Sequence, residues 1–208
     1  MRLPRAALLL GLTAALAGPA VARAEPSLAL RLGVAPAFGS ASGNLPVSHA
    51  VPLQFPVQLD ALWRFGPIAA GLYGSWGPAQ AGGCATGESC SASVWRAGAQ
   101  GTWTFAASRI EPWAGLSAGW EWATLDRQHG GTISDTWSGL ELAAQGGVEW
   151  PILRWLALGP YALLGGGRYS QYSVETGAGS TAARISDPAV HLWLQVGVRG
   201  RLVVGGAR

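Results

Sequence analysis

The chain has 208 residues, among them 31 glycines and 11 tryptophans, and a formal net charge of +3. Of its 14 basic residues, Arg2, Arg5 and Arg23 lie in the first 24 positions, which leaves 11 basic against 11 acidic residues in the rest. A near-neutral chain lacks the basic patch that nucleic-acid binding requires, so that class of function is excluded. The roughly 184 residues that follow position 24 suffice for one domain.

The first 24 residues have the organisation of a secretory signal peptide. Two arginines begin it, residues 6–17 are apolar, and residues 22–24 (Ala-Arg-Ala) form a small-x-small cleavage site. A membrane-anchoring helix fits less well, because glycine and proline break the apolar run and the run is short. We therefore expect residues 1–24 to be removed, leaving one domain at residues 25–208 that begins with Glu25.

The stretch at residues 191–204 sets the pattern for the rest of the chain. Apart from Gly200 and Val203 its side chains alternate, with an apolar parity (Leu192, Leu194, Val196, Val198, Leu202, Val204) and a polar parity (His191, Trp193, Gln195, Gly197, Arg199, Arg201). Successive strand side chains point to opposite faces, so this is a strand with one apolar and one polar face. It is longer than an ordinary soluble strand of ~5–6 residues and long enough for a tilted membrane-crossing strand, which needs about 9–11.

Seven further segments are predicted strands, at residues 27–39, 53–65, 68–76, 94–105, 111–124, 139–150 and roughly 157–169, and all but the last show the alternation. Only the segment at 157–169 has no assignable parity, since Leu163 and Leu164 fall on opposite faces. Proline cannot donate to a strand ladder, so Pro36, Pro56 and Pro160 predict local bulges.

The connections between the eight segments alternate in length. Long polar stretches at 40–50, 77–93, 126–138 and 174–188 alternate with short turns at 66–67, about 108–109, and 151–155. Outer-membrane barrels have this pattern, with short turns on the periplasmic side and long loops outside. The sequence therefore predicts an all-β fold: a single eight-stranded antiparallel up-and-down transmembrane β-barrel, exported to the periplasm and inserted into the outer membrane of a Gram-negative bacterium.

The aromatic residues favour a bilayer around this barrel. One group flanks the short turns (Trp63, Phe65, Trp103, Phe105, Trp113, Trp150, Trp155), and another lies toward the long loops (Phe38, Trp76, Trp95, Trp120, Trp122, Trp137, Trp193). A membrane with two interfaces selects two aromatic belts. A soluble sandwich or lipocalin-like barrel would need the apolar parity inside, and the belts and the strand lengths disfavour that arrangement.

With these features the chain resembles the small eight-stranded outer-membrane barrels of the OmpA, OmpX and OmpW type, over essentially all of residues 25–204. Two short pieces, Glu111-Pro112-Trp113-Ala114-Gly115 and Gly159-Pro160-Tyr161, are similar to the proline–aromatic strand starts of that family. The resemblance implies contact with outer-membrane lipid and insertion by the outer-membrane barrel assembly machinery.

Cysteines and histidines are the candidates for special chemistry. Cys84 and Cys90 lie in a polar, glycine-rich segment, and in an exported chain we expect a small extracellular disulfide loop rather than a metal site. His49, His129 and His191 all map to the long-loop end, where convergence would allow metal binding or base catalysis. None has a spacing such as HxH or HExxH, so we expect no metal, cofactor or catalytic site, and the sequence leaves their convergence open.

Nine charged residues share the polar parity of the strands: Arg31, Asp60, Arg64, Arg96, Glu121, Glu141, Glu149, Arg199 and Arg201. An eight-stranded barrel is just wide enough to be filled by its own side chains, so these charges are expected to neutralise one another rather than to line a solute path. If the hairpin around residues 108–109 is symmetric, Arg96 lies opposite Glu121, with Glu141 at a similar height. Trp95 then lies opposite Trp122 on the lipid face.

These features favour a non-enzymatic outer-membrane barrel with a side-chain-filled lumen. Its role would be structural or would involve long extracellular loops, whose external partner the sequence does not identify. An outer-membrane lipid-modifying enzyme is one alternative, although no motif resembles the His-x-Ser of lipid A deacylases. A secreted soluble carrier barrel is the other.

Overall fold

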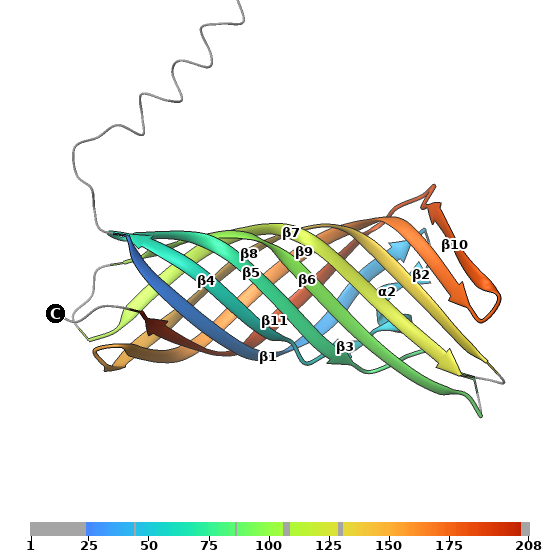
Figure 1. The fold of residues 1–208 in the computed structure, drawn as a ribbon, viewed down its shortest axis with the longest axis horizontal. Coiled ribbons are helices and arrows are strands. Elements are labelled where there is room, and N and C mark those ends of the chain that lie inside the picture. The colour runs from blue at the N-terminus through green and yellow to red at the C-terminus, as the bar shows by residue number, and fades with distance from the viewer. Residues whose placement is uncertain (1–23, 44, 86, 106–108, 129–130, 205–208) are drawn as a thin grey trace, which may run out of the picture.

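A closed ring of long antiparallel strands forms the body of the protein in the computed structural model (Figure 1). The structure describes residues 24–43, 45–85, 87–105, 109–128 and 131–204, so the predicted signal peptide, except for Ala24, lies outside the described residues. The elements are β1 (Glu25–Ser42), β2 (Leu45–Pro46), α2 (Val47–Ala50), β3 (Leu53–Gln54), β4 (Val57–Phe65), β5 (Ile68–Ala79), β6 (Ser89–Thr104), β7 (Glu111–Gln128), β8 (Thr132–Leu153), β9 (Leu156–Thr176), β10 (Gly179–Arg184) and β11 (Val190–Val203).

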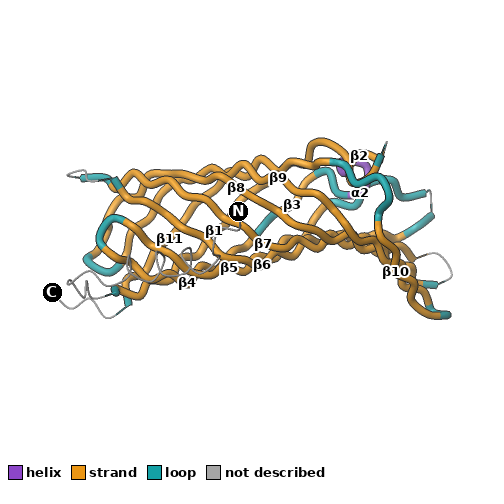
Figure 2. Tube along the Cα trace, turned by 90° about the horizontal axis from the view of Figure 1, so that it is seen from above, coloured by secondary structure: helices purple, strands orange, loops and turns teal. Residues whose placement is uncertain are grey.

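Eight of these strands make the ring. In order, β4, β5, β6, β7, β8 and β9 each pair with the next, β9 pairs with β11, and β11 returns to β1, which pairs with β4. This up-and-down order confirms the predicted all-β fold class and the eight-stranded barrel. The short β3 pairs with β1 and β5, and β10 folds back on β9 as a hairpin. In Figures 1 and 2, β10 and α2 lie at the outer end, opposite the end where β1 begins.

No helix among the described residues is long and apolar enough to cross a membrane.

Several strands run further toward the outer end than predicted. β7 continues to Gln128, β8 begins at Thr132, and β9 continues to Thr176, so the predicted polar loop at 126–138 is mostly strand. The predicted loop is wrong because polar residues do not end these strands. Ala123 and Leu125 still face inward here, as does Asp135, which pairs with Arg127, and the outward positions have become polar.

The prolines interrupt the strand ladder without shifting it, so the predicted bulges are wrong. Register between β1 and β11 is the same before and after Pro36, from Val34↔Val196 to Ala37↔Trp193. Pro56 separates β3 from β4, but both pair with β1 in one continuous register, and Pro160 lies opposite Val198 without a shift. A missing N–H removes one hydrogen bond and does not require an extra residue. The shifts between β8 and β9 lie instead at Ser138/Gly139 and at Pro151/Leu153.

The two faces of the strands differ as the alternation predicts. Outward Leu30, Leu142 and Val198 are 47%, 58% and 56% exposed, whereas inward charged residues such as Arg31 and Glu121 are buried. So large an apolar surface around a ring of strands suits a bilayer and not water. The structure also settles the parity of β9, where Leu163 faces inward and Leu164 outward.

Two aromatic belts are present, but three predicted members are missing from them. Outward aromatic residues lie near the short turns (Trp63, Phe65, Trp103, Phe105, Trp150, Trp155) and toward the long loops (Phe38, Trp76, Trp95, Trp122 and the half-buried Trp120). Trp113, Trp137 and Trp193 are instead buried inside the barrel. Their assignment to the belts was wrong because it considered height along the strand and neglected parity.

Glycine pairs on the inner face make room for tyrosine rings. Gly98 lies opposite Gly119, and a Cβ atom on Gly119 would lie 2.3 Å from the Oη of Tyr73. Gly33 lies opposite Gly197 in the same way, and its Cβ would lie 3.0 Å from the Oη of Tyr161. Part of the high glycine content therefore serves to fit large side chains into a narrow lumen.

Candidate functional site

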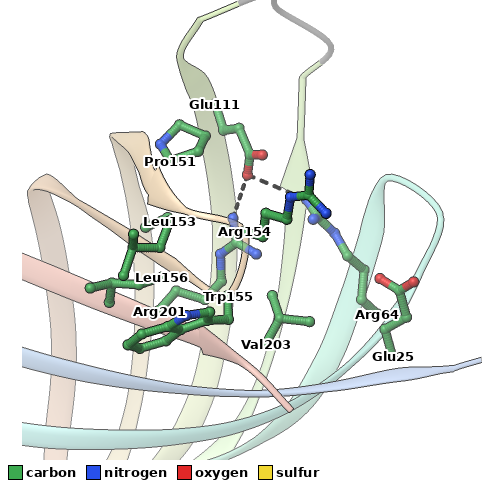
Figure 3. A pocket seen from close by; sticks show the side chains of 11 residues that line it. Glu25, Arg64, Glu111, Pro151, Leu153, Arg154, Trp155, Leu156, Arg201 and Val203 are labelled. Atoms are coloured by element: carbon green, nitrogen blue, oxygen red, sulfur yellow. Dashed lines mark hydrogen bonds and ion pairs between the residues drawn. The ribbon is translucent and has the colours of Figure 1, made fainter. Parts of the chain in front are cut away.

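The interior charges form three layers, which we call lower, middle and upper from the short-turn end outward. In the lower layer, Arg201 Nε lies 2.7 Å from Glu149 Oε2, and the same guanidinium contacts Glu111. Arg64 Nη2 lies 4.0 Å from Glu111 Oε2. Arg64, Glu111 and Arg201 border, together with Trp155, a cleft of about 390 Å³ at the short-turn end (Figure 3).

The middle layer surrounds Arg31, which is completely buried. Its guanidinium lies 2.7 Å from Asp60 Oδ2 and donates to Gln100 Oε1 at 2.9 Å and to Gln145. Arg199 joins this layer to the lower one, because its Nε is 3.7 Å from Asp60 Oδ2 and its Nη1 contacts Glu149. The charges are thus linked from one strand to the next across the lumen.

The indole of Trp113 lies close to two arginines, Arg31 and Arg199. The Cζ of Arg199 lies 4.4 Å and that of Arg31 5.4 Å from the centre of the indole ring. Aromatic faces attract guanidinium groups, so this ring supports two like charges in a site without water access. Its inward position gives Trp113 a role inside the lumen.

The upper layer is centred on Arg96. Its Nε lies 2.7 Å from Glu121 Oε2 and 2.6 Å from Glu141 Oε2, and its Nη1 donates to Gln54 Oε1 at 3.1 Å. The register places Arg96 opposite Glu121 and Trp95 opposite Trp122, as the symmetric hairpin predicted.

Glu121 has further partners in this layer. Trp193 Nε1 donates to Glu121 Oε1 at 3.2 Å, and the hydroxyl of Tyr169 contacts the same oxygen. His191 Nε2 lies 3.1 Å from it, and the imidazole stacks on Tyr169 with ring centres 4.0 Å apart. Six strands, β3, β6, β7, β8, β9 and β11, therefore contribute to one buried cluster.

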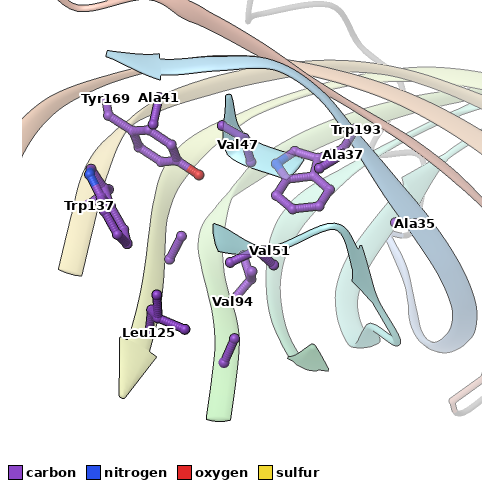
Figure 4. Close-up of a cluster of buried hydrophobic side chains, with 12 residues drawn as sticks. Ala35, Ala37, Ala41, Val47, Val51, Val94, Leu125, Trp137, Tyr169 and Trp193 are labelled. Atoms are coloured by element: carbon purple, nitrogen blue, oxygen red, sulfur yellow. The ribbon is translucent and has the colours of Figure 1, made fainter. Parts of the chain in front are cut away.

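An apolar plug covers the upper layer (Figure 4). The segment around α2 folds into the mouth of the barrel and buries Val47 and Val51 against Val94, Tyr169 and Trp193. A hydrogen bond from the amide of Gly82 to the carbonyl of Ala50 (3.0 Å) ties this segment to the next loop. Tyr169 and Trp193 belong to both the plug and the upper layer, so the two are continuous.

The structure brings eight of the nine predicted lumen residues into buried or nearly buried ion pairs; Arg64 is partly exposed at the short-turn end. Sequence reasoning missed Glu111, which pairs with Arg201 from the start of β7. It also missed the plug, whose only sequence signal is a pair of valines, Val47 and Val51, in an otherwise polar stretch.

Of the cysteines and histidines that the structure describes, only His191 belongs to this network. Cys84 and Cys90 form a disulfide, with Cα atoms 6.4 Å apart. His49 is exposed on α2, His191 is buried in the upper layer, and His129 lies outside the described residues. Within the described part of the chain, no group of three or more His, Cys, Asp or Glu side chains could hold a metal ion.

A ring of eight antiparallel strands with an apolar outer face, two aromatic belts and a charged interior defines a small transmembrane barrel of the outer-membrane type. Three solved structures share the fold. Neisserial surface protein A (NspA) has a TM-score of 0.51 at 16% identity, over 83% of this chain and 95% of that one. A major outer membrane protein from Thermus thermophilus has a TM-score of 0.58 at 12% identity, over 86% and 100%. The outer membrane protein OprG from Pseudomonas aeruginosa has a TM-score of 0.50 at 14% identity, over 87% and 98%.

At these identities the comparison shows the fold alone, and it confirms the fold expected from the resemblance to OmpA-, OmpX- and OmpW-type barrels. No protein-family model and no curated protein matches the chain.

Proposed function

We propose that the chain is a non-enzymatic outer-membrane barrel that is closed to solutes and acts structurally or through its extracellular surface. The observation that carries this proposal is the continuous filling of the lumen. Arg31 and Asp60 in the middle layer are 0% exposed, Glu121 in the upper layer is 1% exposed, and the plug lies above them.

The charge balance of the lower and middle layers supports a closed lumen. Arg31, Arg199 and Arg201 face Asp60, Glu149 and Glu111 in direct contacts. A passing solute would have to separate these pairs in a medium of low dielectric constant, where an unpaired charge is very unfavourable. The network therefore favours a structural role over conduction.

The start of β1 supports export and removal of residues 1–24. β1 begins at Glu25, directly after the predicted cleavage site, and pairs there with Arg64 of β4. Cleavage would leave the whole first strand intact in the barrel. We expect outer-membrane lipid to contact the apolar face and the barrel assembly machinery to insert the chain. We propose no external partner for the extracellular loops.

Planar-bilayer recording tests the closed lumen. Wild-type protein should give no steady conductance at neutral pH. A porin with a water-filled channel, recorded under the same conditions, should conduct and so serves as the positive control. Steady conductance of the wild type would contradict the proposal. Mass spectrometry of lipid A from cells with and without the chain tests the enzymatic alternative, and we expect identical spectra.

A further inference from the structure

Beyond the outer aromatic belt, the outward face of β6 to β9 is polar. Eleven side chains form it, all exposed or half-buried, and eight of them carry a hydroxyl group. We call this surface the hydroxyl face; it consists of Ser89, Ser91 and Ser93 on β6, Thr124, Asp126 and Gln128 on β7, Thr132, Ser134 and Thr136 on β8, and Ser173 and Glu175 on β9.

The strand register arranges these hydroxyl groups in rows. Ser93 lies opposite Thr124, Thr124 opposite Thr136, and Thr136 opposite Ser173. Neighbouring strands are ~4.8 Å apart, so the row repeats at that spacing across four strands. Thr124 Oγ1 lies 3.1 Å from Thr136 Oγ1. The other side of the same sheet, including Leu125, packs into the plug and holds the row rigid.

This face continues the lipid-facing surface without a break. Trp95 and Trp122 form the outward pair directly below Ser93 and Thr124. From Trp122 to the end of β7 at Gln128, a rise of ~3.3 Å per residue and a tilt of ~40° give a height of roughly 15 Å above the belt. The hydroxyl face therefore lies at the level of the headgroups of the outer leaflet.

A cation marks the boundary below the hydroxyl face. Arg168 is exposed on the outward side of β9, between Leu140 of β8 and Val190 of β11. Its Nε donates to the carbonyl of Pro188 at 3.0 Å, which fixes the guanidinium at the outer belt. A guanidinium suits a phosphate group, and lipid phosphates lie between acyl chains and saccharide. The outward surface thus presents apolar, cationic and hydroxyl zones in that order.

We infer that Arg168 and the hydroxyl face bind the outer-leaflet glycolipid of the surrounding membrane, Arg168 through its phosphate and the hydroxyl face through its core saccharide. The inference rests on the proposed outer-membrane location. A protein partner or a second copy fits less well, because the centres of protein interfaces are apolar and aromatic, and this face has no such side chain. Only Asp126 and Glu175 carry charge on the face, which suits a partner rich in uncharged hydroxyl groups.

Vesicle binding with two defined glycolipids tests the inference. The folded chain is reconstituted in phosphatidylcholine vesicles that contain either lipid A alone or lipid A with its core saccharide, and retained glycolipid is measured by mass spectrometry after detergent extraction. Wild type should prefer the core-bearing lipid by about tenfold or more, since each hydrogen bond contributes up to about tenfold in affinity. Thr124→Val with Thr136→Val should abolish most of this preference.

Matched variants separate the two parts of the site. Thr181→Val makes the same chemical change on the other side of the sheet, where Thr181 pairs with Val174, and should keep the preference. Arg168→Gln should weaken binding of both glycolipids equally and leave their ratio unchanged. Ser93→Ala with Ser173→Ala repeats the test in the same row if the threonine variant fails to fold.

Equal binding of the two glycolipids by the wild type overturns the inference, as does a preference that survives both double variants. Cross-linking of the face to a second copy in place of glycolipid overturns it too. Conductance measured on the same vesicles reports separately on the closed lumen, so failure of either proposal can be recognised.

Discussion

Replacing Arg96 by alanine should destabilise the barrel strongly. The guanidinium contacts Glu121 and Glu141 at 2.7 and 2.6 Å, and both carboxylates are almost completely buried. Removing one partner of a buried ion pair typically costs about 3–5 kcal/mol, because the remaining charge is uncompensated. Here the loss leaves two carboxylates close together, so we expect a cost at the upper end of that range.

The partners of the two carboxylates decide which second substitution restores stability. Glu121 still receives hydrogen bonds from Tyr169 and Trp193, whereas the hydrogen bond described for Glu141 comes from Arg96. Arg96→Ala with Glu141→Gln should therefore recover more stability than Arg96→Ala with Glu121→Gln. Urea unfolding in vesicles, monitored by tryptophan fluorescence, gives the free energy of unfolding of Arg96→Ala and of the two double variants. Arg96→Ala at wild-type stability, or no rescue by Glu141→Gln, would refute the reasoning.

The lipid face, the loops and the plug give three further predictions. Val196→Arg, on the outward face near mid-membrane, should block insertion or lower the free energy of unfolding by about 2–4 kcal/mol. Val190→Arg, at the outer end of the same strand, should lower it by only about 0–1 kcal/mol. A folding titration in vesicles measures both values. Equal costs would contradict the membrane depth of β11. The Cys84–Cys90 loop should be labelled on intact cells and contain no free thiol after non-reducing purification. Val51→Asp should free the plug, seen as protease cleavage in the α2 segment with an intact barrel, and a protected segment would count against this packing.

Strand pairing and the inside–outside assignment were predictable because side-chain alternation records them directly. Arg96 and Glu121 could be paired from the sequence alone, since a tight symmetric turn fixes the register of a hairpin. The charged residues of the lumen were predictable for the same reason: parity separates them from the lipid-facing leucines and valines. Counting parity would also have placed Trp113 and Trp193 inside.

The plug and the layer contacts could not be read from the sequence. Val47 begins the single turn of α2 and Val51 follows it, and two valines four residues apart are too few to indicate that the segment folds back into the mouth of the barrel. Contacts such as Arg31 with Gln145 join residues on strands that are far apart in the sequence, and they depend on the curvature of the closed ring. The sequence does not show which side of β9 faces the lumen, because apolar Leu163 occupies an inward position beside Trp113 and Tyr161.

The tyrosines that lie over glycine pairs constrain how this protein can change over time. A Cβ atom at Gly119 would lie 2.3 Å from the Oη of Tyr73 and 2.5 Å from the backbone carbonyl oxygen of Ala97, so a side chain there requires both the ring and the neighbouring strand to move. Replacing Tyr73 first would leave a void over two glycines and weaken both strands. Neither order of substitution leaves stability unchanged, so Tyr73, Gly98 and Gly119 should vary together among related sequences.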